Sequence, residues 1–149
     1  MIEIKKDKFI INGNEKMLKN VNIIKTEKDG LCFSNRFTDC VDCEYDTNDL
    51  YQSIVGAGLK GFMMANDVIV NLNNVESMFI KYYQLAGISI HACKQDHADL
   101  CLLTLVCKNG RTESIPFNTH KEAEKCYHEI DSKLSDLKNE EVVEKLLNT

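Results

Sequence analysis

One stretch, residues 100–137, constrains the fold of this chain more than any other, because it joins a hairpin pattern to an amphipathic helix pattern. Leu100–Val106 is apolar on both faces, as expected of a strand in the middle of a covered sheet. Asn109-Gly110 then predicts a two-residue type I′ turn, in which both central residues take positive φ. The stretch therefore predicts an antiparallel hairpin that leads directly into a helix.

The helix pattern begins at a capping box. The Thr119 side chain can accept a hydrogen bond from the backbone of Glu122, and the Glu122 side chain can reach back to Thr119. Apolar residues then recur at helical spacing and form one stripe: Ala123, Cys126, Tyr127, Ile130, Leu134 and Leu137. We expect this helix to pack its stripe on the sheet.

The earlier part of the chain adds further strand patterns and one short helix. The strand patterns cover residues 8–11, 17–25, 31–37, 40–45, 68–72, 75–83 and 88–94. Asp46 or Thr47 can cap a short helix over residues 47–55, and the glycine-rich Gly56–Ala65 predicts a loop. We predict an α+β fold in which a mainly antiparallel, bent or partly closed sheet of about seven to nine strands is packed by the C-terminal helix.

The order of elements over Val68–Leu137, several antiparallel strands followed by a helix, resembles the small bacterial pleckstrin-homology-like domains. In those domains a helix plugs one end of a bent sheet. The resemblance rests on element order alone and implies a fold without implying a function.

Two short segments echo one another. Leu18–Ile24 (LKNVNII) resembles Leu72–Met78 (LNNVESM), and each precedes further strands and a capped helix. The echo indicates either a duplicated unit or two similar solutions to building a sheet. No linker composition divides the chain, so we predict one domain over residues 1–138 and a separate tail over residues 139–149.

The tail carries a second apolar face. Glu141 occupies the position where the first helical stripe would continue, so either the helix breaks near Asn139 or its apolar face turns away from the core. Exposed apolar patches usually mark contacts, and the simplest partner is a second copy of the chain. We therefore predict a homo-oligomer whose contact residues are Val142, Val143, Leu146 and Leu147.

Charge and cysteine content bound the partners and the location. A net charge of -5 argues against general nucleic-acid binding, which needs a basic surface. No apolar run approaches the roughly 18 residues of a membrane span, and the N-terminus lacks a secretory pattern, which predicts a cytoplasmic protein with no membrane partner. The seven scattered cysteines then predict buried thiols in a reducing compartment. Abundant Lys, Asn and Ile suggest a bacterial or phage source.

The segment Gly56–Gly61 matches G-x-G-x-x-G, but too few residues separate it from the next strand pattern for a dinucleotide-binding crossover helix. A looser hypothesis is that its backbone amides hold a small anion or a nucleotide, with basic side chains as charge partners. The candidate ligand-binding residues are Gly56, Gly58, Lys60, Gly61, Arg36 and Arg111.

A second cluster concentrates soft ligands: His91, Cys93, His97 and Cys101. If residues 88–94 pair with the strand from Leu100, Cys93 lies opposite Cys101, and a zinc or thiol site becomes an alternative. Leucines share that face, however, which favours packed thiols. We predict no metal and no cofactor, and we lean against an enzyme.

The leading hypothesis is a non-enzymatic binding module of bacterial or phage type, acting as a homo-oligomer on a protein or small-molecule partner. One alternative is a protein that sequesters a nucleotide or small anion in the Gly56–Gly61 loop. The other alternative is the zinc or thiol site around His91 and Cys93.

Overall fold

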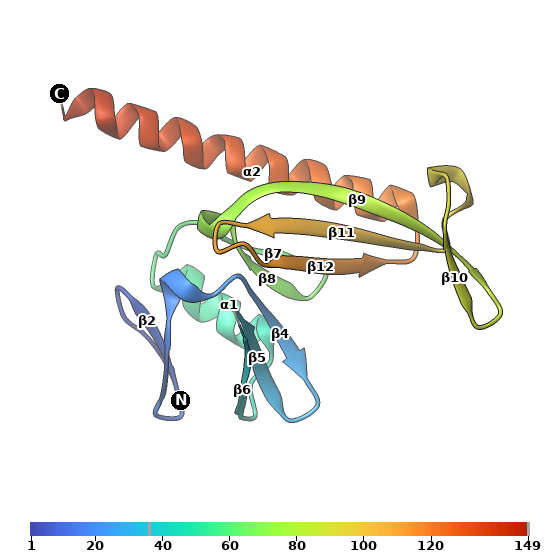
Figure 1. The fold of residues 1–149 in the computed structure, drawn as a ribbon. Helices are drawn as coiled ribbons and strands as arrows, with labels where there is room; N and C mark the ends of the chain where they lie inside the picture. The colour runs from blue at the N-terminus through green and yellow to red at the C-terminus, as the bar shows by residue number, and fades with distance from the viewer. Residues whose placement is uncertain (36, 149) are drawn as a thin grey trace. The chain divides into compact units, whose positions relative to one another are not determined.

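The computed structural model describes residues 1–35 and 37–148 and confirms an α+β fold of mostly antiparallel sheets with a C-terminal helix (Figure 1). The strands are β1 Ile2–Ile4, β2 Lys8–Ile11, β3 Asn14–Met17, β4 Ile23–Glu27, β5 Gly30–Ser34, β6 Thr38–Asp42, β7 Phe62–Ala65, β8 Val68–Asn71, β9 Val75–Ala86, β10 Ser89–Ala92, β11 Leu100–Cys107 and β12 Thr112–Phe117. The helices are α1 Thr47–Gly56, α2 His120–Leu147 and the 3-10 turns η1 Leu18–Asn20, η2 Leu72–Asn74 and η3 Gln95–His97.

The strands form three sheets, so the prediction of a single sheet of about seven to nine strands is wrong. Their orders are β1-β2-β3, β6-β5-β4-β8-β7 and β10-β9-β11-β12. The chain changes sheet at a 3-10 turn: η1 separates β3 from β4, and η2 separates β8 from β9. These turns contain no glycine or proline, so the strand pattern runs through them without an interruption visible in the sequence. The pleckstrin-homology-like resemblance stays a prediction.

The chain divides into two compact units. The first, here called the N-terminal unit, comprises Met1–Met78 and Thr104–Ile115. The second, here called the helical unit, comprises Phe79–Leu103 and the chain from Pro116 onward. The predicted boundary after residue 138 stays a prediction.

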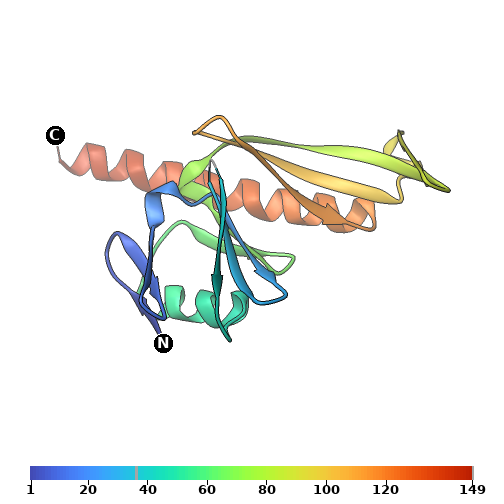
Figure 2. The ribbon, with the colours of Figure 1, turned by 60° about the horizontal axis from the view of Figure 1, so that its bottom comes forward.

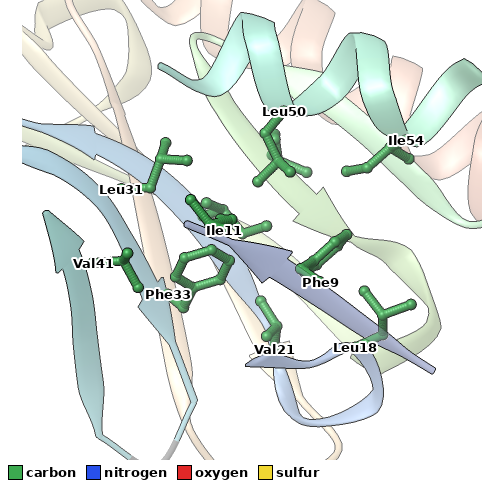
Figure 3. Close-up of a cluster of buried hydrophobic side chains, with 11 residues drawn as sticks. Phe9, Ile11, Leu18, Val21, Leu31, Phe33, Val41, Leu50 and Ile54 are labelled. Atoms are coloured by element: carbon green, nitrogen blue, oxygen red, sulfur yellow. The ribbon is translucent and has the colours of Figure 1, made fainter. Parts of the chain in front are cut away.

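The core of the N-terminal unit forms around α1 (Figure 3). Asp46 caps this helix in a capping box with Asp49, as one of the two predicted caps. Leu50 and Ile54, which are 0% and 1% exposed, lie in a cluster with side chains of β2 and β5. Since α1 contacts β1 as well as β4, β7 and β8, it joins the three-stranded sheet to the five-stranded sheet.

The two echoing segments have the same local backbone. Each is preceded by a tight hairpin turn in which an asparagine, Asn12 or Asn66, has φ of 48°. Each contains a 3-10 turn, and the backbone amide of the first residue of this turn donates a hydrogen bond to a carbonyl in the loop before the hairpin. Leu18 N donates to Asp7 O at 3.0 Å, and Leu72 N donates to Gly61 O at 2.7 Å. The paired residues keep a constant spacing along the sequence, which favours a duplicated unit over two independent solutions.

Two expected turns differ from the structure. Asn109 is not among the described residues with positive φ, and Cys107 N donates to Arg111 O at 2.9 Å, so three residues rather than two form the turn between β11 and β12. Gly110, with φ of 86°, supplies the left-handed position that such a three-residue turn requires. Within the predicted Gly56–Ala65 loop, the last four residues form β7, which pairs with β8.

The helical unit contains α2 as one uninterrupted helix (Figure 2). Thr119 caps it as predicted, with Glu122 N donating to Thr119 Oγ1 at 3.3 Å. The stripe is buried at Ala123, Cys126 and Ile130 and half-buried further along. Because the helix runs through to Leu147 without a break near Asn139, its last apolar side chains turn to solvent and are between 53% and 79% exposed. None of the described helices is long and apolar enough to cross a membrane.

Candidate functional site

A hollow of about 340 Å³ lies in the N-terminal unit where the two repeated segments meet, and is here called the lysine hollow. Leu18 and Phe62 are among its apolar lining residues. Its polar lining comes from both segments: Lys6, Asp7, Lys19, Lys60, Asn71, Asn73 and Asn74. Each lysine is exposed, so the hollow combines apolar lining residues with cationic side chains at its edge.

Asparagines of η2 hold the backbone segments that carry two of these lysines. Asn73 Nδ2 donates to Lys60 O at 3.4 Å, and Asn74 Nδ2 donates to Lys19 O at 3.0 Å. These bonds fix where each lysine side chain leaves the backbone. The asparagines are therefore positioning residues, and the lysines supply the charge.

Gly61 is required by a close approach. Its φ is +88°, and a Cβ at this position would lie 2.3 Å from Asn73 Nδ2. Gly58 also has positive φ but meets nothing within 4 Å, and Gly56 is the last residue of α1. Since α1 precedes the glycines and β7 follows them, this loop does not lead into a helix, as an anion-binding loop at a helix N-terminus would. Of the predicted loop residues, the structure brings Lys60 to the hollow, with Gly61 packed beneath Asn73.

The charge around the hollow is locally positive, since three lysines and one aspartate line it. Lys8 lies nearby in sequence but does not add to this charge, because its ammonium group forms an ion pair with Glu15 at 2.9 Å. The hydrogen bond from Lys8 lowers the pKa of Glu15, and the same bond raises the pKa of Lys8. The lysines that line the hollow are Lys6, Lys19 and Lys60.

The other predicted charge partners do not join this site. Arg111 Nε lies 2.8 Å from the buried carboxylate of Glu113, and Arg111 Nη2 donates to Thr38 Oγ1 at 3.2 Å. Arg111 thus neutralises a buried acid and ties the β11–β12 turn to β6. Arg36 lies outside the described residues.

Sequence reasoning missed Lys6 and Lys19. A usable signal was present: Lys6 precedes Asn12 by the same number of positions as Lys60 precedes Asn66. Had the echo been extended backward from Leu18, it would have paired Lys6 with Lys60 and pointed to their shared surroundings.

The proposed metal ligands are not brought together. β10 pairs with β9, with His91 opposite Gln84, so the expected pairing of residues 88–94 with the strand from Leu100 is wrong. His91 and His97 are exposed, whereas Cys101 is buried, and burial raises the pKa of its thiol. Among the described residues, no group of three or more His, Cys, Asp or Glu side chains could hold a metal ion. The absence of a metal and of a cofactor stays a prediction.

Five of the seven cysteines fall into two groups, and the other two, Cys43 and Cys93, are half-buried free thiols. Cys101, Cys107 and Cys126 are buried thiols, as predicted, and burial raises the pKa of Cys107 and of Cys126 to about 11. Cys32 and Cys40 instead form a disulfide between β5 and β6, which the expectation of thiols alone did not include.

No family model matches the sequence, and no curated protein matches it significantly. A solved structure of a LytTr DNA-binding domain, from a response regulator of Bacillus cereus, is 14% identical. It matches with a TM-score of 0.42, over 87% of this chain and 94% of that one. A likeness at this level carries no argument about the role of any residue here.

The description of that structure names DNA, which stands against the prediction of a module without nucleic-acid binding. We therefore do not propose any of the three predicted functions: a homo-oligomer acting on a protein or small molecule, a nucleotide-sequestering loop, or a zinc or thiol site. A net charge of -5 describes the whole chain, whereas phosphate contacts depend on local charge, so the charge argument does not by itself exclude DNA. The assignment of Val142, Val143, Leu146 and Leu147 as contact residues stays a prediction.

Proposed function

We propose that the protein binds DNA and that the lysine hollow contacts the phosphate backbone. The observation that carries the proposal is the convergence of Lys6, Lys19 and Lys60 on one hollow with a single acidic lining residue, Asp7. DNA is named for the Bacillus cereus domain; for this chain, the support comes from its own lysines.

Lysine side chains at such an edge suit phosphate contacts. Each ammonium group is a compact charge on a flexible stem, so it can follow phosphates without a fixed geometry. Contacts of this kind position a protein on a duplex and supply affinity without reading sequence. The proposed activity is therefore backbone binding with strong salt dependence. A DNA ligand would also agree with the predicted cytoplasmic location.

The test is a titration of a fluorescently labelled mixed-sequence duplex, followed by anisotropy at several salt concentrations. Neutralising three phosphates predicts a slope of log K against log salt of about -2.7. The affinity should then fall roughly 40-fold between 50 and 200 mM salt.

Variants locate the contact. Lys6→Ala, Lys19→Ala or Lys60→Ala should each weaken binding and reduce the slope by about 0.9, irrespective of duplex sequence. Lys28→Ala, at an exposed lysine in the turn between β4 and β5, is the matched control and should leave both unchanged. Equal losses in all four variants would contradict the assignment of the hollow. Wild type that does not bind at 50 mM salt would contradict DNA binding itself.

A further inference from the structure

The Cys32–Cys40 disulfide lies at the edge of the five-stranded sheet. The two residues are direct partners in the antiparallel pairing of β5 with β6, with Cα atoms 4.0 Å apart. β6 is the last strand in the sheet order and therefore has a neighbouring strand on one side only. Cys40 is exposed, whereas Cys32 is 7% exposed. A reagent in solution thus reaches the bond from the Cys40 side.

Few other interactions hold β6 in place. Val41 is the one buried residue of this strand. The ladder to β5 continues past the strand end through Cys43 N, which donates to Asp29 O at 3.1 Å. Beyond this ladder, Thr38 accepts from Arg111, and Asp39 pairs with Lys16 at the surface. Short, exposed strands of this kind open locally at low cost, so a covalent bond at the centre of β6 controls how often it opens.

The closed loop also forms one wall of a second hollow, of about 500 Å³. Five of its lining residues lie between the two bonded cysteines: Phe33, Asn35, Phe37, Thr38 and Asp39. Phe37 is 81% exposed within this loop. Opening β6 would therefore change the shape of this hollow as well as the edge of the sheet.

We infer that Cys32 and Cys40 form a reversible redox site whose state sets the opening of β6. The inference uses the cytoplasmic location that accompanies the proposed function, since disulfides in that compartment are usually transient, catalytic or redox-sensing. A disulfide at an exposed edge strand is also open to the attack that exchange requires. The free thiol Cys43 is not part of the site, because it packs against the core on the other face of the strand.

The chemistry is thiol–disulfide exchange with a dithiol reductant. One thiolate of the reductant attacks Sγ of Cys40, the Sγ–Sγ bond breaks, and Cys32 leaves as a thiolate that takes up a proton. The second thiolate of the reductant then attacks the mixed disulfide and releases Cys40 as a thiolate, which is protonated in turn. The protein gains two electrons and two protons, and the reductant becomes a disulfide. A disulfide oxidant, such as oxidised glutathione, reverses the reaction.

The experiment uses the full chain without DNA, so its outcome is independent of the proposed function. Alkylation after denaturation should label five cysteines in the oxidised protein and all seven after treatment with dithiothreitol. Amide hydrogen exchange should then show about tenfold faster exchange in β6 on reduction, with little change in β7 at the opposite edge. Oxidised glutathione should restore both results.

Variants separate the site from its surroundings. A Cys32→Ser, Cys40→Ser double variant should show the fast exchange of β6 without reductant, and Cys43→Ser, the matched control, should keep the redox response. If the double variant does not fold, the comparison of oxidised and reduced wild type decides alone. Seven labelled cysteines after treatment with oxidised glutathione would overturn the inference. So would equal exchange in the two states, or loss of protection in every strand together, since the latter would mark a structural disulfide.

Discussion

Asn71 is the residue whose replacement best tests how the two repeated segments are joined. Its side chain is 2% exposed and makes four hydrogen bonds. Nδ2 donates to Leu18 O at 3.2 Å and to Val21 O at 2.8 Å, both in the first segment. Oδ1 accepts from Asn73 N and Asn73 Nδ2, both in the second. One buried amide therefore connects η1 to η2.

We expect Asn71→Ala to destabilise the protein by about 2–3 kcal/mol. Four hydrogen bonds at roughly 0.5–1.5 kcal/mol each would together contribute about 2–6 kcal/mol. Both carbonyls keep a second partner, however: Leu18 O still accepts from Val21 N, and Val21 O still accepts from Asn74 Nδ2. The lower half of the range therefore applies. Urea unfolding at neutral pH measures the change.

Asn71→Asp is a more specific test, because it preserves the size of the side chain and replaces the Nδ2 donor with a carboxylate oxygen, which accepts hydrogen bonds. The new carboxylate would face the two carbonyl oxygens, so the pKa of this carboxyl should rise above its ordinary value of about 3.9. A raised folded-state pKa gives stability that is present below the unfolded value and is lost as pH rises through the folded value. Asn71→Asp should therefore be closer to wild type at pH 4 than at pH 7, where it should be less stable than Asn71→Ala.

The matched control is Asn48→Asp on the exposed face of α1, which should show no comparable pH dependence. A cost below about 0.5 kcal/mol for Asn71→Ala would show that the amide does not join the segments. A difference between Asn71→Asp and wild type that stays constant from pH 4 to pH 7 would refute the geometry of Nδ2 facing the two carbonyls.

Two further predictions concern the helical stripe and the buried thiols. Ile130→Ala should cost about 2–5 kcal/mol in urea unfolding, because Ile130 is fully buried, and Leu134→Ala should cost less, because Leu134 is half-buried; equal costs would contradict the burial pattern. The raised pKa values of Cys107 and Cys126, about 11 against an ordinary value of 9.0, favour the protonated thiols in the folded state. Their stabilising contribution should be complete below pH 9 and lost as pH rises through 11. Replacing both with Ala should therefore reduce the fall in the urea midpoint between pH 9 and pH 11.

Local signals in the sequence predicted local structure well. Asn12-Gly13, a pair typical of two-residue hairpin turns, forms such a turn, in which Ile11 pairs with Asn14. The caps at Asp46 and Thr119 begin α1 and α2, since a capping side chain needs only its own next few residues. Asn109-Gly110 carries the same turn signal as Asn12-Gly13, yet it forms a longer turn. In that turn Asn109 Oδ1 accepts from Arg111 N and Asn109 Nδ2 donates to Asn35, and this side-chain bonding selects the alternative.

The division into sheets could not be predicted by the same reasoning. Which strands pair depends on contacts far apart in sequence, such as Ile24 with Ile69 in the pairing of β4 with β8. Alternating and apolar patterns indicate that a segment is a strand, but they do not indicate which other strand it pairs with. The same limit affected the cysteines, because Cys32 and Cys40 can bond only when β5 and β6 pair in the observed register.

The candidate site depends on a weak sequence signal that can be interpreted only with the structure. The echo between Leu18–Ile24 and Leu72–Met78 concerns seven-residue segments, and nothing in either segment suggests a ligand. Once both segments have the same hairpin, 3-10 turn and strand, positions outside the echo become comparable, and Lys6 corresponds to Lys60.

The correspondence is not complete, since Lys19 has Asn73 as its counterpart, and Asn73 bonds Lys60 O instead of presenting a charge. Both copies thus supply lysines, whereas the amides that position Lys19 and Lys60 come from the second copy alone. If duplication produced this arrangement, Asn73→Lys would place a lysine at both corresponding positions. The substitution should loosen the position of Lys60, because the bond to Lys60 O would be lost, while one positive charge is gained. Affinity for a duplex would then rise less than a fourth lysine alone predicts, whereas a full increase in the salt slope of about 0.9 together with unchanged stability would show that Asn73 does not position Lys60.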